Sequence, residues 1–291
     1  MSYLYLIFSV LTLSLSSVLC EFYNRRTINT KNATQLFNFV RMVCTLIVWC
    51  VIFIIDFSFE WGVLIYSLGF GACFAVTNIA LIHAFKCGSV ALTSLMLQMS
   101  LIGVTAWGLV FWDAPFTIFV GVGLALVIIS ITLCILDKKT ESNIQKKVNL
   151  KWLAFASLAF LGNAGCSIIQ REQQIAYAGK HGSLLMVFGM IIATLVCLVL
   201  YLKSDRRSSV SVLKRNLIFP AGAGVSNALL NLFVILLATS ELSPSLIYPV
   251  LAVGGLAVTM MFSLFAFKEV LRWWQWVGVI LGAVAIALLN L

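Results

Sequence analysis

Long apolar stretches alternate with short polar connections along the whole chain. Each stretch holds about 20 residues, the length that a helix needs to cross the hydrocarbon core of a bilayer. Strands are not expected, because no stretch has the two-residue alternation of a barrel strand and because a backbone in lipid must satisfy its own hydrogen bonds. The ten predicted spans are residues 3–22, 36–55, 61–84, 89–112, 115–136, 152–176, 183–202, 217–239, 244–267 and 274–290.

The longest polar interruption falls in the middle of the chain, between Asp137 and Lys151. It predicts a first five-helix repeat at 1–137, a basic central loop at 138–151 and a second five-helix repeat at 152–291. Because five is an odd number, the second repeat must insert upside down relative to the first. Inverted repeats that meet near the bilayer midplane are a recurrent design of secondary transporters.

Small residues recur at matching places in the two predicted repeats. The fifth span carries Gly121 and Ala125, and the tenth carries Gly278 and Gly282. Pairs of small residues four positions apart let two helix backbones approach closely. We therefore expect close packing at both spans, and a homodimer contact through the helix that holds Gly278 and Gly282.

Basic residues lie almost entirely in alternate connections. The connections counted as odd hold the runs Lys138 to Lys151 and Lys203 to Arg215, whereas the even ones hold only Arg171 and Lys180. The positive-inside rule places the odd connections in the cytoplasm and both termini outside. We expect a multi-pass protein of the plasma membrane, and the net charge of +9 is explained by topology rather than by nucleic-acid binding.

Composition excludes several classes of protein. Hydrophobic residues make up 62% of the chain and charged ones 10%, less than half of the quarter or so found in soluble domains. The eight cysteines form no CxxC pair and mostly lie in apolar stretches, where they are typical packing residues. No Walker A loop, GxSxG elbow or HExxH motif occurs. The sequence predicts no enzyme activity, no cofactor and no metal site.

Amides within the predicted spans are the best candidates for substrate binding. An amide that faces lipid leaves donors and acceptors unsatisfied, so these side chains are expected to face the protein interior. Each alone is equally well explained as an interhelical hydrogen bond. Together they predict a polar cavity between the two repeats, lined by Asn78, Gln98, Asn163, Ser167, Asn227, Asn231 and Tyr248.

Three further residues are candidates for coupling or gating. Glu21 ends the first span beside two arginines, where it is either an interfacial ion pair or a gate. Arg41 lies about one turn inside the second span, where it either extends to the interface or pairs with Glu21 or an anionic substrate group. Pro249 removes a backbone hydrogen bond and can kink the ninth span, although simple helix packing explains this region equally well.

The order of these motifs resembles the drug/metabolite transporter superfamily, in its EamA-like ten-helix branch. The match rests on Leu36 to Arg41, on Leu92 to Asp113 and Leu246 to Glu269 with their acids at the turn, and on Gly278 to Gly282. The resemblance implies a ten-helix transporter and a role in transport, without fixing a substrate. It also implies that the helix holding Pro249 is a gating helix beside the substrate. It also implies cytoplasmic termini, which conflicts with the orientation that the basic loops predict.

The sequence thus predicts a secondary transporter, an exporter of a small metabolite, amino acid or drug that works by alternating access. Small-molecule substrate and membrane lipid are the expected partners. Two alternatives remain open. One is a flippase for a lipid-linked sugar or undecaprenyl-phosphate carrier, with a basic phosphate site near Arg41 or Arg171. The other is a membrane scaffold or sensor without transport activity.

Overall fold

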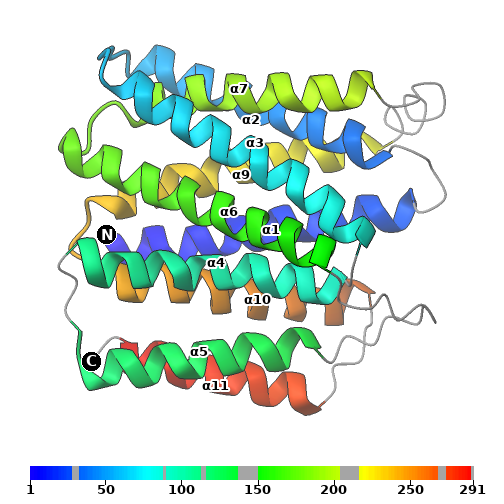
Figure 1. The fold of residues 1–291 in the computed structure, drawn as a ribbon, viewed down its shortest axis with the longest axis vertical. Coiled ribbons are helices and arrows are strands. Elements are labelled where there is room, and N and C mark those ends of the chain that lie inside the picture. The colour runs from blue at the N-terminus through cyan, green and yellow to red at the C-terminus, as the bar shows by residue number, and fades with distance from the viewer. Residues whose placement is uncertain are drawn as a thin grey trace. The chain divides into compact units, whose positions relative to one another are not determined.

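A computed structural model of the protein describes residues 1–27, 33–87, 90–112, 116–136, 150–203, 216–267 and 273–289. Within these segments the chain forms ten α-helices (Figure 1), which confirms the predicted all-α fold. The helices are α1 (Ser2–Arg26), α2 (Ala33–Ile55), α3 (Val63–Cys87), α4 (Val90–Phe111), α5 (Ile118–Leu136), α6 (Leu150–Ala176), α7 (Gly182–Leu202), α9 (Ile218–Ala238), α10 (Pro244–Phe267) and α11 (Trp273–Leu289).

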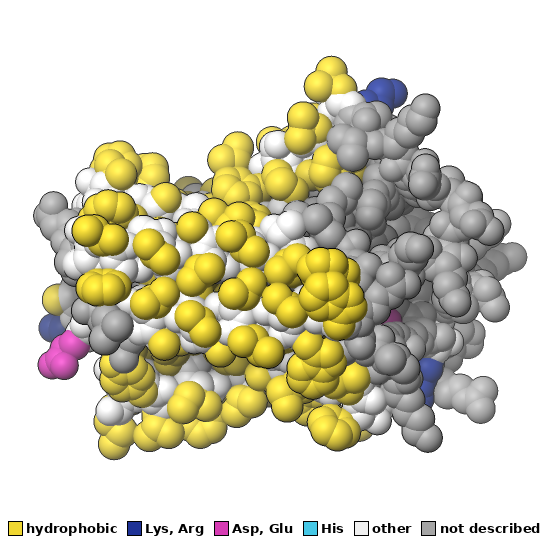
Figure 2. Space-filling model, turned by 90° about the horizontal axis from the view of Figure 1, so that it is seen from below, with side chains coloured by type: hydrophobic (Ala, Val, Ile, Leu, Met, Phe, Trp, Pro, Cys, Tyr) yellow, Lys and Arg dark blue, Asp and Glu magenta, His cyan; other side chains and the backbone are white. Residues whose placement is uncertain are grey.

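Seven helices in the described part of the chain are long and apolar enough to cross a membrane. Shorter apolar helical stretches occur at Met96–Phe111, Ile118–Leu133 and Trp276–Leu289, within α4, α5 and α11. Large hydrophobic side chains are widely exposed, with Ile55 80% and Phe265 79% accessible. Figure 2 shows one face on which hydrophobic side chains predominate. A surface of this kind belongs in lipid rather than water, so the chain is a multi-pass membrane protein.

The helices gather into two compact units, each built from both halves of the sequence. Unit 1 comprises Met1–Ala75 and Ile169–Ser240, and unit 2 comprises Val76–Ile168 and Glu241–Leu291. Unit 1 therefore holds α1, α2, α7 and α9 with the first half of α3 and the end of α6. Unit 2 holds α4, α5, α10 and α11 with the remainder of α3 and α6.

Unit 1 is held together by α9, which packs against both α1 and α2 (Figure 1). The close approach depends on small residues. A methyl group placed on Gly224 would lie 2.5 Å from the carbonyl oxygen of Arg41, so only glycine fits there. Thr45 Oγ1 donates to the carbonyl oxygen of Gly224 at 2.9 Å and joins α2 to α9. Ser16 Oγ makes the corresponding bond from α1 to the carbonyl of Ala223 at 3.4 Å.

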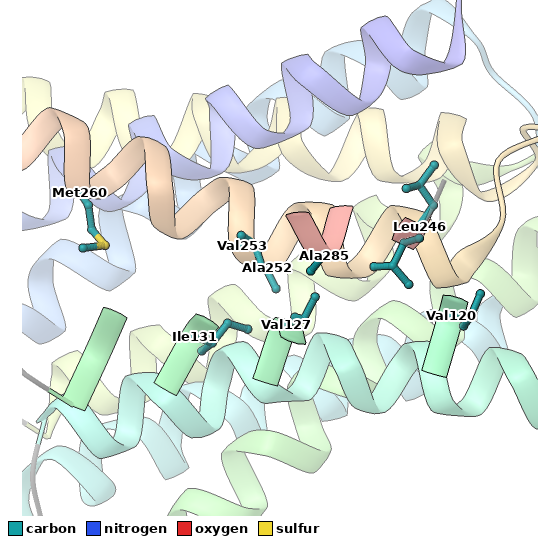
Figure 3. Packing of buried hydrophobic residues seen from close by; sticks show 9 residues of the cluster. Val120, Val127, Ile131, Leu246, Ala252, Val253, Met260 and Ala285 are labelled. Carbon is teal, nitrogen blue, oxygen red and sulfur yellow. The ribbon is translucent and has the colours of Figure 1, made fainter. Parts of the chain in front are cut away.

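Unit 2 is built around α5, α10 and α11, whose apolar side chains form a continuous core. Figure 3 shows this core, with Val127 and Ile131 from α5 beside Ala252 and Val253 from α10. In lipid such packing is favoured by van der Waals contact rather than by removal of water. The small residues of α11 allow this close contact.

Gly278 and Gly282 of α11 both pack inside unit 2. Ser130 Oγ of α5 donates to the carbonyl oxygen of Gly278 at 2.7 Å. A methyl group on Gly282 would lie 2.3 Å from Cγ1 of Val253. The glycine face is thus occupied by helices of the same chain. The predicted homodimer through the helix that holds Gly278 and Gly282 stays a prediction, and Ile280 and Val284 are the exposed large side chains beside them on this helix.

Candidate functional site

A chain of hydrogen-bonded amides crosses from α6 to α9 inside unit 1. Gln170 Nε2 donates to Asn231 Oδ1 at 2.8 Å and lies 3.4 Å from the sulfur of Met186 on α7. Asn231 Nδ2 in turn donates to the carbonyl oxygen of Asn227 at 2.8 Å. Asn227 and Asn231 share one face of α9, as their spacing of four residues predicts. We call Gln170, Asn227 and Asn231 the amide chain.

The amide chain is enclosed but not saturated. Gln170 is only 3% exposed, in a helix that is long and apolar enough to span a bilayer. Neither Gln170 Oε1 nor Asn227 Nδ2 hydrogen-bonds a residue that the structure describes. Each atom can therefore still hydrogen-bond another molecule.

A second layer of glutamines lies one turn further along α6. Gln173 and Gln174 are fully or almost fully buried, at 0% and 1% exposure. Gln173 Nε2 donates to the carbonyl oxygen of Lys180 at 2.9 Å, and Gln174 Nε2 donates to Gln173 Oε1 at 2.5 Å. A methyl group on Gly182 would lie 3.0 Å from Gln174 Nε2, so glycine lets the start of α7 pack against this layer.

A tight turn beneath these glutamines fixes the angle between α6 and α7. Ala178, Gly179 and His181 all have positive φ, at 50°, 81° and 62°. The first and last of these are strained for residues with a side chain. His181 Nδ1 lies 2.9 Å from Ser58 Oγ, and the ring of Tyr177 meets that of His181 edge-on. The contacts of His181 with Ser58 and Tyr177 hold this turn in place. The turn therefore positions Gln173 and Gln174, which precede it in α6.

The glutamines of α6 are functional candidates that the sequence analysis missed. They lie at the end of a predicted span, where polar residues are expected to face the membrane surface. Their spacing carried the missing information, because residues 170, 173 and 174 share one helical face. Arg171, on the neighbouring face, is also largely buried, at 9% exposure.

Unit 2 holds a smaller polar pair between α4 and α6. Asn163 Nδ2 donates to Ser100 Oγ at 2.6 Å. Phe160 lies beside this pair, where a methyl group on Gly103 would approach its ring to 3.0 Å. Gln98 and Ser167 are part-exposed, and neither forms a hydrogen bond with the residues that the structure describes. Asn163, which is part-exposed, thus makes an interhelical hydrogen bond.

The other candidates from the sequence occupy separate places. Tyr248 is 2% exposed on α10, where its ring lies 6.5 Å from that of Trp112. Pro249 follows it inside the same helix. Asn78 is part-exposed on α3, and Glu21 is part-exposed near the end of α1. Hence Asn227 and Asn231 belong to unit 1, while Asn78, Gln98, Asn163, Ser167 and Tyr248 belong to unit 2. One cavity shared by all of them stays a prediction.

Arg41 lies eight residues, ~12 Å, from the start of α2, because this helix begins at Ala33, ahead of the predicted span. Its Nε atom is enclosed and has no hydrogen-bond partner among the described residues. Its charge interacts with the thiols of Cys20 of α1 and Cys197 of α7. Pairing of Arg41 with Glu21 stays a prediction.

No three His, Cys, Asp or Glu side chains gather within the part of the chain that the structure describes. The sites consist instead of amides, hydroxyls and one guanidinium. Such groups bind and orient polar molecules, and they do so most strongly where lipid and protein exclude water.

Comparison with known proteins identifies the fold and no activity. No protein family and no curated protein matches the sequence. Among solved structures, the chain is similar to a crystal structure whose description names no function, with a TM-score of 0.76 and 9% sequence identity. The alignment covers 99% of this chain and 95% of the other. The complete ten-helix arrangement is thus one that another protein also adopts.

Proposed function

We propose that this protein is a secondary transporter that moves a small polar solute across the membrane by alternating access. The amide chain carries the proposal. Gln170, Asn227 and Asn231 lie within membrane-spanning helices and bond to one another, yet they keep an acceptor and a donor for another molecule. Amides that only joined helices would gain most by satisfying each other fully, since every unmade hydrogen bond in an apolar setting is costly.

Two inverted five-helix repeats are the architecture that suits this mechanism, and α3 and α9 support them. Each is the third helix of its predicted repeat. Gly69, Gly71 and Asn78 in α3 have the same spacing as Gly222, Gly224 and Asn231 in α9. The amide chain thus includes one of two asparagines that recur at equivalent positions.

The packing partners of these helices also correspond. A methyl group on Gly71 would lie 2.9 Å from the carbonyl oxygen of Gly189 on α7, and one on Gly224 would lie 2.5 Å from that of Arg41 on α2. Both α2 and α7 are the second helix of a predicted repeat. The same contact between second and third helices therefore occurs twice, which favours an internal repeat over chance similarity of apolar spans.

The solute is expected to be neutral in part and rich in hydrogen-bonding groups. Amides offer both donors and acceptors, so amino acids, sugars and drugs all suit the amide chain. The basic loops favour a plasma-membrane protein with both termini outside. Export by this route requires no cofactor, because alternating access needs only that the solute site opens to each side in turn.

A flux screen in proteoliposomes tests the proposal. Vesicles that contain the protein are loaded with a labelled metabolite library, and the solute that leaves fastest is then followed in variants. Gln170→Ala and Asn227→Ala are expected to lower its flux at least tenfold, because each removes a group that faces the solute. Ser17→Ala is the matched control, since Ser17 Oγ is exposed and donates only to its own helix at Leu13, 3.0 Å away. Flux that survives both amide variants would overturn the proposed site.

A flippase for a lipid-linked phosphate is the second candidate, and Arg41 is the observation that favours it. A buried cation in a membrane span is costly unless an anion compensates it. Release of a labelled lipid-linked phosphate from one leaflet, without flux of any soluble solute, would select this second function over the first. A protein with neither activity would be a scaffold or sensor.

A further inference from the structure

Arg41 has a charge that no described group compensates. Its Nε atom is enclosed and unbonded, and no described residue accepts a hydrogen bond from the guanidinium. The ionisable neighbours are Cys20 and Cys197, which supply thiols rather than carboxylates. A guanidinium without a counter-ion in a membrane span has a high free-energy cost, so we expect Arg41 to have an anionic partner.

The backbone of Arg41 is fixed by its surroundings. Thr45 Oγ1 lies 2.9 Å from the carbonyl oxygens of both Arg41 and Gly224. Gly224 presses directly against this part of α2. The backbone of Arg41 is therefore held in place where α2 meets α9. The thiols that interact with its charge, those of Cys20 and Cys197, lie on α1 and α7. A rigid start reduces the entropy that a binding group loses when it holds a ligand.

Helix packing does not require the arginine. The equivalent position of the second predicted repeat, on α7, is Gly189, which makes the same backbone contact without any side chain. Since one repeat packs well with glycine here, the guanidinium of the other serves something besides packing.

Arg26 provides the contrast within the same unit. It lies at the exposed end of α1, and its guanidinium stacks over the ring of Phe219 at 4.9 Å from the centroid. That cation has both water and an aromatic face to stabilise it. Arg41 is only part-exposed, its Nε atom is enclosed, and it lies within a helix long and apolar enough to span the membrane.

We propose that Arg41, between α1, α2 and α7, is a binding site for a single oxyanion, a carboxylate or phosphate group. A planar guanidinium binds such groups through two parallel hydrogen bonds, and these hydrogen bonds are stronger where water is excluded. The inference deepens the proposed transport function and rests on it only for its purpose: the oxyanion would be the charged end of the transported molecule, or the headgroup of a lipid.

Anion protection of the purified full-length protein tests the site. The protein is placed in phosphatidylcholine nanodiscs, and its unfolding temperature is followed with acetate or inorganic phosphate against chloride at equal ionic strength. Either oxyanion is expected to stabilise the protein. The Arg41→Gln substitution should weaken the apparent affinity of the protein for the oxyanion about 10- to 100-fold, the range for loss of hydrogen bonds to a charged group. Arg41→Lys should lose less, and Arg26→Gln should match the unmodified protein.

A second measurement needs no variant. The thiols of Cys20 and Cys197 interact with the charge of Arg41, so a bound oxyanion that neutralises this charge is expected to slow their alkylation, whereas Cys50 lies nine residues along α2 and serves as the internal control. Slower labelling of the first two, with Cys50 unchanged, supports the site. Unchanged labelling together with no thermal protection overturns it, as does full protection in a folded Arg41→Gln variant.

The source of the oxyanion follows from a change of lipid. Protection by soluble acetate or phosphate in phosphatidylcholine assigns the site to a solute. Protection that appears only in nanodiscs containing phosphatidic acid assigns it to a lipid phosphate. Failure of this site is separable from failure of transport: flux without oxyanion protection overturns the Arg41 site alone, and Arg41-dependent protection without any flux overturns the transporter alone.

Discussion

Unit 1 and unit 2 use the same kind of contact to join their own helices. The side chains that pack within each unit, however, differ in chemical character. In both, a hydroxyl donates to a glycine carbonyl of a neighbouring helix: Thr45 to Gly224 in unit 1, and Ser130 to Gly278 in unit 2. Beside that contact, unit 1 holds the amide chain and Arg41, while the α5, α10 and α11 region of unit 2 holds aliphatic side chains.

The difference between the two units distinguishes side chains that serve helix packing from side chains that have another use. Aliphatic side chains in lipid gain little by leaving it, so the core of unit 2 stabilises mainly through close fit. Polar side chains in unit 1 are costly wherever they are not satisfied, and their retention there indicates a use for them. The polar pair Asn163 and Ser100 shows that unit 2 is not wholly apolar, but it lies between α4 and α6, outside that aliphatic core.

The strongest test of the shared packing device is Gly224→Ala. The added methyl group would meet the backbone carbonyl of Arg41 at 2.5 Å, so α2 and α9 must separate. Overpacking of this kind costs about 1–3 kcal/mol or more, and we expect a clear fall in the unfolding temperature of the detergent-solubilised protein. Gly222→Ala is the control, because its nearest neighbour is the flexible end of Leu19 at 3.0 Å. Equal loss in both variants would contradict this account.

Gly282→Ala should destabilise unit 2 almost as much as Gly224→Ala destabilises unit 1, but here a second substitution should rescue stability. The obstacles here are two side-chain atoms, Cγ1 of Val253 and, at 2.7 Å, Oγ of Ser130. We therefore expect Val253→Ala, which removes the first of them, to restore part of the lost stability when combined with Gly282→Ala. The corresponding pair in unit 1, Gly224→Ala with Cys44→Ala, should show no rescue, because the Arg41 carbonyl and the Cys44 Cβ both remain.

Much of the fold could be predicted from the sequence, since lipid imposes a simple rule. Apolar stretches at 183–202 and 217–239 correspond closely to α7 at Gly182–Leu202 and α9 at Ile218–Ala238. The shared face of Asn227 and Asn231 also followed from helical spacing alone. Length, apolarity and period are local properties, and local properties can be predicted from a single chain.

Pairing between distant helices could not be predicted in this way. A span that is apolar on every side does not mark which face meets a neighbour, so nothing in α1 identified α9 as its partner. For the same reason, the link from Asn231 to Gln170, 61 residues apart, was not foreseen. Both depend on how helices are arranged in space, which periodicity does not encode.

Gln170→Ala is expected to have a smaller effect on stability than either glycine variant. It leaves Asn231 Oδ1 without its donor, and hydrogen bonds between membrane helices average about 0.6 kcal/mol. A double-mutant cycle with Asn231→Ala measures the coupling between the two side chains directly. Coupling near that value, combined with a large loss of solute flux, would separate binding from structure. A coupling of several kcal/mol would instead make the amide chain chiefly structural.

The smallest expected difference distinguishes the two hydroxyls that join the helices. Thr45 Oγ1 has one proton to share between two carbonyl oxygens at 2.9 Å, one of which belongs to its own helix. Ser130 Oγ donates to Gly278 alone, at 2.7 Å. Ser130→Ala should therefore cost up to about 1 kcal/mol, and Thr45→Val, which keeps the shape of the side chain, should cost less. Thermal unfolding of both variants in one detergent makes the comparison. A larger loss for Thr45→Val would mean that unit 1 depends on its hydroxyl more than on the close fit of Gly224.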